Sequence, residues 1–174
     1  MNRSSALCVA FALSLCSAAG ASAQTETKHL TVEPSSPLAA VAPGTRVSLM
    51  LDVMPKRTMH VYAPGQADYI PVSLAIKADP SITARAVQFP TPQKVMNKAA
   101  GEEQLVYSGR FRIVQDGTIA ATPVVRARAR TPGATVTING TLRYQACDDS
   151  ICYLPVNVPV AWTVALKPSA RVTP

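Results

Sequence analysis

Proline restricts the fold of this chain more than any other residue. It occupies 15 of the 174 positions, which is about 9% against a usual frequency of about 5%, and it recurs along the chain from Pro34 to Pro174. Proline breaks helix interiors and central strands, because its ring fixes one backbone angle and removes the N–H donor. Long helices, helical bundles, coiled coils and helical repeats are therefore excluded. Hydrophobic residues make up 48% of the sequence, which is enough for a folded core and excludes general disorder.

The first 23 residues have the pattern of an export signal peptide. Arg3 gives a positive start, residues 6–19 are almost entirely apolar, and small residues precede a cleavage position after Ala23. The apolar run is shorter than the roughly 20 residues that a membrane-spanning helix needs, and Leu15 before Cys16 does not fit a lipoprotein signal. We expect this signal peptide to be removed and the mature chain to be soluble, in the periplasm or otherwise exported.

Cleavage of the signal peptide would reduce the number of cysteines from four to two. Cys8 and Cys16 leave with the signal peptide, so that Cys147 and Cys152 remain in a compartment where disulfides persist. The net charge is +7, but the basic residues are not interleaved with aromatic ones, and an exported protein does not meet nucleic acid. We therefore expect no nucleic-acid partner.

Short segments of alternating apolar and polar residues run through the chain. They cover residues 47–53, 72–76, 111–113 and 156–164, and a period of two is typical of strands with one buried face. Turn pairs of proline or glycine with aspartate or alanine separate them. Several short strands at this spacing predict an all-β fold, a β-sandwich.

The same patterns predict the domain organisation. We expect residues 24–44 to form a lead-in segment, residues 45–166 the sandwich domain, and residues 167–174 a flexible tail. Residues 94–104 are polar and predict a loop or one helical turn. Apolar residues keep one parity from Val136 to Ala146 across an Asn-Gly pair, so we expect one long strand with a local bulge at Gly140.

Arginine and alanine alternate along residues 126–130. The pattern of Arg126, Arg128 and Arg130 predicts a strand that presents three guanidinium groups on one face. The simplest interpretation is a solvated outer face. The alternative is a docking surface for an acidic partner or for anionic lipid.

The most informative segment holds the two remaining cysteines. Patterned strands enter and leave YQACDDSICYLP, which spans residues 144–155, so Cys147 and Cys152 lie at the neck of a hairpin-like loop where their sulfurs can meet. Asp148 and Asp149 lie between them, and carboxylates beside a thiol raise its pKa. The flanking Tyr144 and Tyr153 could form walls around the pair.

Spacing alone leaves three interpretations of this pair open. A structural disulfide is the plainest, although closing a loop of about six residues stabilises a fold by only about 2 kcal/mol. A reversible redox pair needs two neighbouring thiols that can open without unfolding the domain. Copper binding is the third, because sulfur and imidazole ligands suit Cu(I), although methionines are more often core filler. The soft side chains outside the pair are Met50, Met54, Met59, Met96 and His60.

The cysteine segment and the strand VNVPVAW that follows it resemble the amino-terminal periplasmic domain of DsbD-type thiol:disulfide interchange proteins. The stretches HVYAPG and QLVYSGRF look like earlier strands of that family, so the resemblance covers residues 30–165. It implies an immunoglobulin-like sandwich with the cysteine pair at one end. It also implies electron relay from a thioredoxin-like donor to oxidised proteins that carry CxxC motifs, without a small-molecule cofactor.

The resemblance also implies roles for individual residues. Cys152 would be the sulfur that exchanges with partners, and Cys147 the sulfur that resolves the mixed disulfide. The two inward positions of the family's tyrosine-rich strand fall on His60 and Tyr62. The expected partners are thioredoxin-fold proteins and a membrane electron carrier, and the expected state of this chain is a monomer.

The sequence departs from the family where a cap loop shields the cysteines. The corresponding stretch, Met96 to Glu103, contains Glu102 and Glu103 but no aromatic residue. Met96 is the apolar side chain that could take the place of an aromatic cap. A non-catalytic exported binding module with a structural disulfide therefore remains the alternative to a redox relay.

Overall fold

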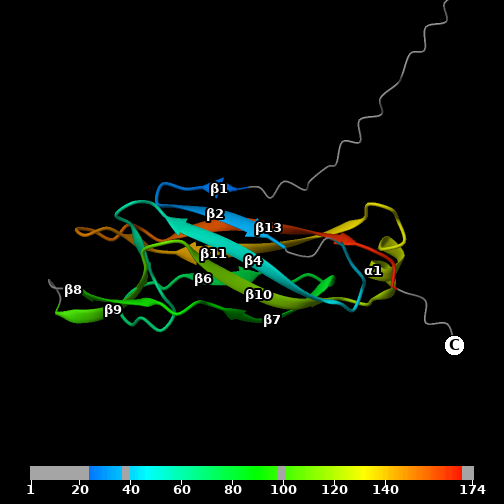
Figure 1. Cartoon of the computed structure of the whole chain (residues 1–174), viewed down its shortest axis with the longest axis horizontal. Coiled ribbons are helices and arrows are strands. Elements are labelled where there is room, and N and C mark those ends of the chain that lie inside the picture. Colours follow the sequence, from blue (N-terminus) through cyan, green and yellow to red (C-terminus); the bar gives the residue numbers. More distant parts are fainter. Residues whose placement is uncertain (1–23, 37–39, 98–100, 170–174) are drawn as a thin grey trace, which may run out of the picture.

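The structure is a computed structural model that describes residues 24–36, 40–97 and 101–169. It is an elongated β-sandwich with one short helix (Figure 1). The elements are β1 (Thr25–Glu26), β2 (Leu30–Ser35), β3 (Ala40–Val41), β4 (Arg46–Pro55), β5 (His60–Tyr62), β6 (Ser73–Ile76), β7 (Ile82–Gln88), β8 (Gln93–Asn97), β9 (Glu102–Tyr107), β10 (Phe111–Ile119), α1 (Pro123–Arg128), β11 (Thr135–Tyr144), β12 (Ala146–Cys147) and β13 (Val156–Leu166). The predicted all-β, immunoglobulin-like sandwich is confirmed.

Two sheets form the body of the sandwich and a third extends one end. The first has the order β1-β2-β4-β10-β7, the second β3-β13-β11-β6, and the third β12-β5-β9-β8. In Figure 1, β8 and β9 lie at the end opposite α1, and the orange loop after β12 lies at that same end. The long strands therefore connect two very different ends of the molecule.

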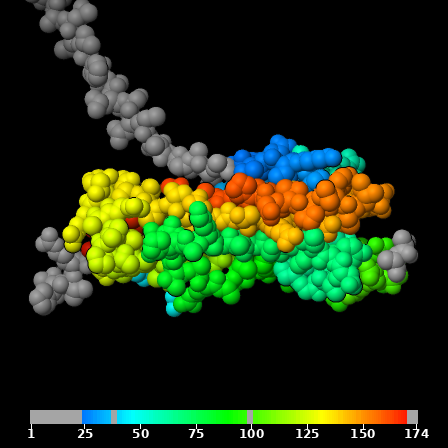
Figure 2. Space-filling model, turned by 180° about the vertical axis from the view of Figure 1, so that it is seen from behind, coloured from blue at the N-terminus to red at the C-terminus, as the bar shows by residue number. Residues whose placement is uncertain are grey.

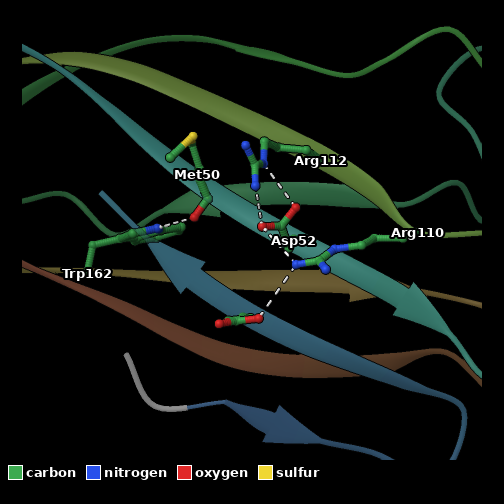
Figure 3. A network of polar contacts seen from close by, with 6 residues as sticks. Met50, Asp52, Arg110, Arg112 and Trp162 are labelled. Carbon is green, nitrogen blue, oxygen red and sulfur yellow. Dashed lines mark hydrogen bonds and ion pairs between the residues drawn. The ribbon is translucent and has the colours of Figure 1, made fainter. Parts of the chain in front are cut away.

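The core lies between the two larger sheets. Leu51 of β4, Ile113 of β10 and Ile138 of β11 are completely buried, because alternate side chains of a strand point to the same face. Trp162 of β13 reaches across the core, and its indole Nε1 donates to the carbonyl oxygen of Met50 at 2.7 Å (Figure 3). This bond satisfies the one polar atom of the indole side chain.

The outer face of the first sheet carries an ion-pair network. Asp52 accepts two hydrogen bonds from Arg112, at 2.9 and 2.6 Å, and Arg110 lies 3.3 Å from the same carboxylate and 3.7 Å from Glu33 (Figure 3). The hydrogen bonds from Arg112 are the main cause that lowers the pKa of Asp52. The network joins β2, β4 and the start of β10 on the solvent side.

The predicted long strand across Asn139-Gly140 is confirmed, but the bulge at Gly140 is wrong. β11 pairs with β13 in continuous register from Thr135 opposite Ala165 to Tyr144 opposite Val156. Glycine is needed there for a different reason. A Cβ at Gly140 would lie 2.9 Å from the carbonyl oxygen of Ala75, so the missing side chain lets β6 approach β11.

The segment predicted as a lead-in is part of the sandwich. β2 pairs with β4 along its whole length, and Leu30 and Val32 are fully buried in the core. β3 pairs in parallel with the end of β13. At the other terminus, the backbone N–H of Lys167 donates to the carbonyl oxygen of Val41, while residues 170–174 of the predicted tail and the predicted signal peptide lie outside the described residues.

The predicted arginine strand is wrong, because Arg126 and Arg128 lie in α1 and Arg130 follows it. The side chain of Thr122 accepts a hydrogen bond from the N–H of Val125. Proline fits the first helical turn without loss of a helical hydrogen bond, so Thr122 and Pro123 start a helix where the arginine alternation predicted a strand. None of the described helices is long and apolar enough to cross a membrane.

The polar segment 94–104 is a hairpin rather than a loop or a helical turn. β8 and β9 pair from Gln93 opposite Val106 to Asn97 opposite Glu102, and residues 98–100 lie outside the described part. Pairing with β9, which also pairs with β5, makes β8 a strand despite its polar sequence. The hairpin belongs to the same sheet as β12, and β5 lies between β9 and β12.

Candidate functional site

The cysteine pair closes a tight turn at the end opposite α1. Cys147 ends β12, and its sulfur is bonded to that of Cys152 with a Cα–Cα distance of 4.0 Å. The N–H of Asp148 donates to the carbonyl oxygen of Ile151 at 3.0 Å, and the N–H of Tyr153 donates to that of Ala146 at 2.9 Å. The pair therefore lies on the predicted hairpin-like loop.

Three segments distant in the sequence meet around this turn. In Figure 2 the orange surface near residue 150 lies at one end of the molecule, next to the teal and green surfaces of the segments near residues 65 and 105. β12 pairs with β5, and β5 pairs with β9. The third sheet thus gives the turn a rigid backing.

The two sulfurs lie in different environments. Cys147 is only 1% exposed and packs with Tyr62 and Val106 in a small cluster of buried side chains. Cys152 is exposed, as are the neighbouring Ile151, at 55%, and Leu154, at 86%. Cys152 therefore presents surface to solvent, whereas Cys147 is covered.

Asp148 organises the turn between the cysteines. Its carboxylate accepts hydrogen bonds from the N–H groups of Ser150 at 2.8 Å and Ile151 at 2.9 Å, and from the hydroxyl of Tyr153 at 2.9 Å. The two backbone hydrogen bonds are the main cause that lowers the pKa of Asp148. The neighbouring Asp149 is exposed and makes no such contact among the described residues.

β5 places its two predicted site residues against the cysteine pair. His60 is directly opposite Cys147 in the ladder between β5 and β12. The hydroxyl of Tyr62 lies 3.7 Å from the sulfur of Cys152, and burial of Tyr62 raises its pKa to about 12. The rings of His60 and Tyr62 meet edge to face at 5.5 Å, so both side chains share the face that meets the disulfide.

The two flanking tyrosines lie in different places. Tyr144 is completely buried in the main core, and its hydroxyl shares a hydrogen bond of 2.9 Å with the hydroxyl of Thr27. Tyr153 is partly exposed, and its ring lies 4.5 Å from the ring of His29, with Lys28 Nζ 5.1 Å from its centroid. Tyr153 therefore supports the turn through Asp148, whereas Tyr144 holds the end of β11 in the core.

An aromatic cover that the sequence did not predict comes from the loop before β6. Tyr69 stacks on Tyr62 at 4.0 Å with an interplanar angle of 21° and packs against the Cys147 cluster. Its hydroxyl donates to Glu102 at 3.0 Å and accepts from Gln104 at 3.0 Å. The only sequence signal for it was a lone tyrosine shortly after a Pro-Gly turn.

The expected cap stretch has a supporting role instead. Glu102 holds Tyr69 from β9, while Met96 on β8 is 59% exposed and so does not serve as a buried lid. Gln145 was also missed. Its side-chain NH2 donates to the carbonyl oxygen of Tyr153 at 3.1 Å, and its oxygen accepts from the N–H of Ile70 at 3.3 Å.

The methionines considered for copper lie on three separate segments of the chain. Met50 and Met54 are on β4, Met59 is in the turn before β5, and Met96 is on β8. Within residues 24–36, 40–97 and 101–169, no group of three or more His, Cys, Asp or Glu side chains is arranged to hold a metal ion.

A β-sandwich with a disulfide at one end, of which one cysteine is buried and the other exposed, defines a class of cysteine-bearing immunoglobulin-like domains. The sequence profile of the thiol:disulfide interchange protein DsbD, N-terminal, matches residues 26–161, and this chain belongs to that family. The resemblance inferred from the cysteine segment is therefore confirmed.

One of the similar solved structures supports this fold, at low sequence identity. The N-terminal periplasmic domain of ScsB from Proteus mirabilis superposes with a TM-score of 0.56 at 11% identity, over 80% of this chain and 49% of that one. This chain therefore spans about half the length of that structure. The reduced N-terminal domain of DsbD from Neisseria meningitidis has a TM-score of 0.46 at 14% identity, over 76% of this chain and 84% of that one. No curated protein matches the chain.

Proposed function

We propose that this domain relays electrons in the periplasm through reversible opening of the Cys147–Cys152 disulfide. The observation that carries the proposal is the difference in burial between an exposed Cys152 and a covered Cys147. A thiolate on a thioredoxin-fold donor with a CxxC motif attacks Cys152 and forms a mixed disulfide, and Cys147 leaves. Thiol–disulfide exchange proceeds through such intermediates.

The surroundings of Cys152 support docking of a protein rather than of a small molecule. Ile151 and Leu154 project from either side of it and are largely exposed, which gives a partner apolar surface to bury. The third sheet holds the backbone behind the turn, so the bond opens while the sandwich remains folded. The reduced pair then passes its electrons to an oxidised protein that docks on the same face.

Export and assembly state belong to the same proposal. The chain acts as a monomer after cleavage near Ala23, and its donor is a thioredoxin-fold protein that a membrane electron carrier keeps reduced. Intact-mass measurement of the exported protein should give a chain that starts at Gln24. A mass that retains the first 23 residues would contradict export by this route.

A trapping experiment tests the relay. Cys147→Ser should capture a CxxC partner as a stable mixed disulfide through Cys152, because no second sulfur remains to resolve it. Cys152→Ser is the matched control, and it should trap little because Cys147 is covered. Equal trapping by both variants, or none by either, would contradict the assignment of Cys152 as the exchanging sulfur.

The redox equilibrium separates a relay from a structural disulfide. A relay pair should equilibrate with thioredoxin-like dithiols, whereas structural disulfides have reduction potentials below about −300 mV and resist them. Alkylation of the equilibrated mixture and mass spectrometry measure the reduced fraction. A bond that stays oxidised at every donor ratio would leave an exported binding module with a structural disulfide.

A further inference from the structure

His60 occupies an unusual place for a polar side chain. It is directly opposite Cys147 in an antiparallel ladder, and side chains at directly opposite positions lie on the same face with Cβ atoms about 4.5–5.5 Å apart. Its Nε2 is buried and has no hydrogen-bond partner in the described part of the chain. A buried, unsatisfied polar atom is costly, so this nitrogen calls for an explanation.

The proposed exchange creates a charge next to this nitrogen. When a donor thiolate bonds to the sulfur of Cys152, the Cys147–Cys152 bond breaks and its electron pair goes to the sulfur of Cys147. That sulfur lies in the cluster with Tyr62 and Val106, where burial disfavours a thiolate. The exchange therefore needs a group that stabilises or protonates the sulfur of Cys147.

Two polar side chains of β5 face the pair, and they differ in what they can do. The hydroxyl of Tyr62 contacts Cys152 rather than Cys147, and its raised pKa makes it a poor acid. The imidazole of His60 can hold a proton near neutral pH. Its position opposite Cys147 suits the sulfur that becomes charged.

On the basis of the proposed function, we infer that His60 is the proton-holding partner of Cys147 during exchange. In the disulfide state the ring is neutral. When the bond opens, a proton from solvent is taken up and shared between His60 and the Cys147 thiolate. The donor's second thiolate then displaces Cys152, which takes a second proton, so the donor is oxidised to a disulfide while the pair gains two electrons and two protons.

The charged groups around His60 favour this role. Burial is the main cause that lowers its pKa in the disulfide state, while Asp149 and Asp148 act in the opposite direction. On the β9 side, Tyr107 is opposite Val61, but its ring stacks on Phe111 and so turns away. In the turn before β5, Lys56 is paired with Glu26. The two aspartates are therefore the nearby charges that stabilise an imidazolium once a thiolate is also present.

The two histidines of the chain make the inference measurable by NMR in the unmodified domain. We expect the pKa of His60 to lie below its ordinary value in the disulfide form and to rise by at least about one unit on reduction, a tenfold change in proton affinity. His29, whose ring lies against Tyr153 rather than opposite Cys147, is the comparison for any general effect of reduction on a histidine at this end. In Cys147→Ala the pKa of His60 should stay at the low value, because no thiolate can form. Equal values in the oxidised and reduced wild type would overturn the inference.

Substitution gives a second readout. His60→Gln keeps a hydrogen-bonding side chain but cannot titrate. The Cys147 thiol should therefore become about tenfold less acidic, as measured by the ultraviolet absorbance of the thiolate during a pH titration. Reduction of the disulfide by dithiothreitol should slow about threefold, because a leaving thiol of higher pKa leaves more slowly. His29→Gln is the matched control. Unchanged acidity and rate in a folded His60→Gln domain, judged by Trp162 fluorescence, would exclude the role.

These measurements are separable from the proposed function. They use dithiothreitol and NMR, and need no protein partner. If the pKa of His60 responds to reduction but no CxxC protein exchanges with the pair, the proposed relay is wrong and the proton-holding role of His60 stands. If partners exchange normally and His60 does not respond, the relay stands and the coupling is wrong.

Discussion

In the main core, side chains from β4, β10, β11 and β13 interlock between two sheets, and Leu51 and Ile138 are among those with no exposed surface. Around Cys147 the buried cluster consists, among the residues that the structure describes, of Tyr62, Val106 and the cysteine itself, with Tyr69 packed on its edge. The first region depends on long-range packing across the whole sandwich. The second is small and lies beside an exposed sulfur. We therefore expect the disulfide to open at one end of the domain while the main core keeps the fold.

The largest expected effect comes from the main core. Leu51→Ala should lower the free energy of unfolding by about 2–5 kcal/mol, because it removes buried methyl groups and leaves a cavity. Urea denaturation followed by Trp162 fluorescence measures the change. A loss no larger than that caused by removing the disulfide would contradict the division between the two regions.

Removal of the disulfide should cost less. The Cys147→Ala, Cys152→Ala double variant should lose about 2 kcal/mol of unfolding free energy, as the chain-entropy account predicts for a loop this short. The fluorescence spectrum of folded Trp162 should be unchanged, because this single tryptophan lies in the main core. A shifted spectrum in the folded variant would show that the core depends on the bond.

The aromatic cover should affect access more than stability. Tyr69→Ala removes the stack on Tyr62, worth about 1 kcal/mol for an aromatic pair, and we expect faster reduction of the disulfide by dithiothreitol. Tyr69→Phe keeps the stack and loses the hydrogen bonds to Glu102 and Gln104, so it is the matched control. An unchanged reduction rate in Tyr69→Ala would mean that the ring does not limit access.

The smallest expected effect concerns the stability of the cysteine turn at low pH. The pKa of Asp148 is lowered in the folded domain, chiefly by the N–H groups of Ile151 and Ser150. A carboxyl whose folded pKa is depressed stabilises the fold above its ordinary pKa, and this contribution is lost as the pH falls through the folded value. The amide resonances of Ser150 and Ile151 should therefore titrate below pH 3.8 while Trp162 fluorescence stays constant. A midpoint at or above pH 3.8 would contradict the lowered pKa of Asp148. In the Asp148→Asn variant the titration of these amide resonances should disappear.

The strands and the cysteine turn could be predicted because their signals are local. Alternation of buried and exposed residues is visible over a few positions, as in β11 and β13, and two cysteines close in sequence at a chain reversal can meet only there. The arginine alternation misled because a period of two over five residues is weaker evidence than the helix start at Thr122 and Pro123. That start was readable from the sequence.

The supporting residues of the site could not be predicted, because they depend on which distant segments meet. Tyr69 becomes a cover only because its loop returns over β5, and Glu102 holds it only because residues 93–97 pair as a strand with β9. Neither residue carries a local pattern that indicates this. Conversely, Tyr144 is adjacent to the cysteine segment in sequence yet points into the main core, because it occupies the buried parity of β11.

Gln145 has a consequence for movement at this end of the domain. Its one amide group is hydrogen-bonded both to the segment that follows Cys152 and to the loop that carries Tyr69. If the segment after Cys152 moves outward, these hydrogen bonds pull on the loop that carries Tyr69. Movement of the segment after Cys152 is thus coupled, through the Gln145 side chain, to movement of the loop that carries Tyr69.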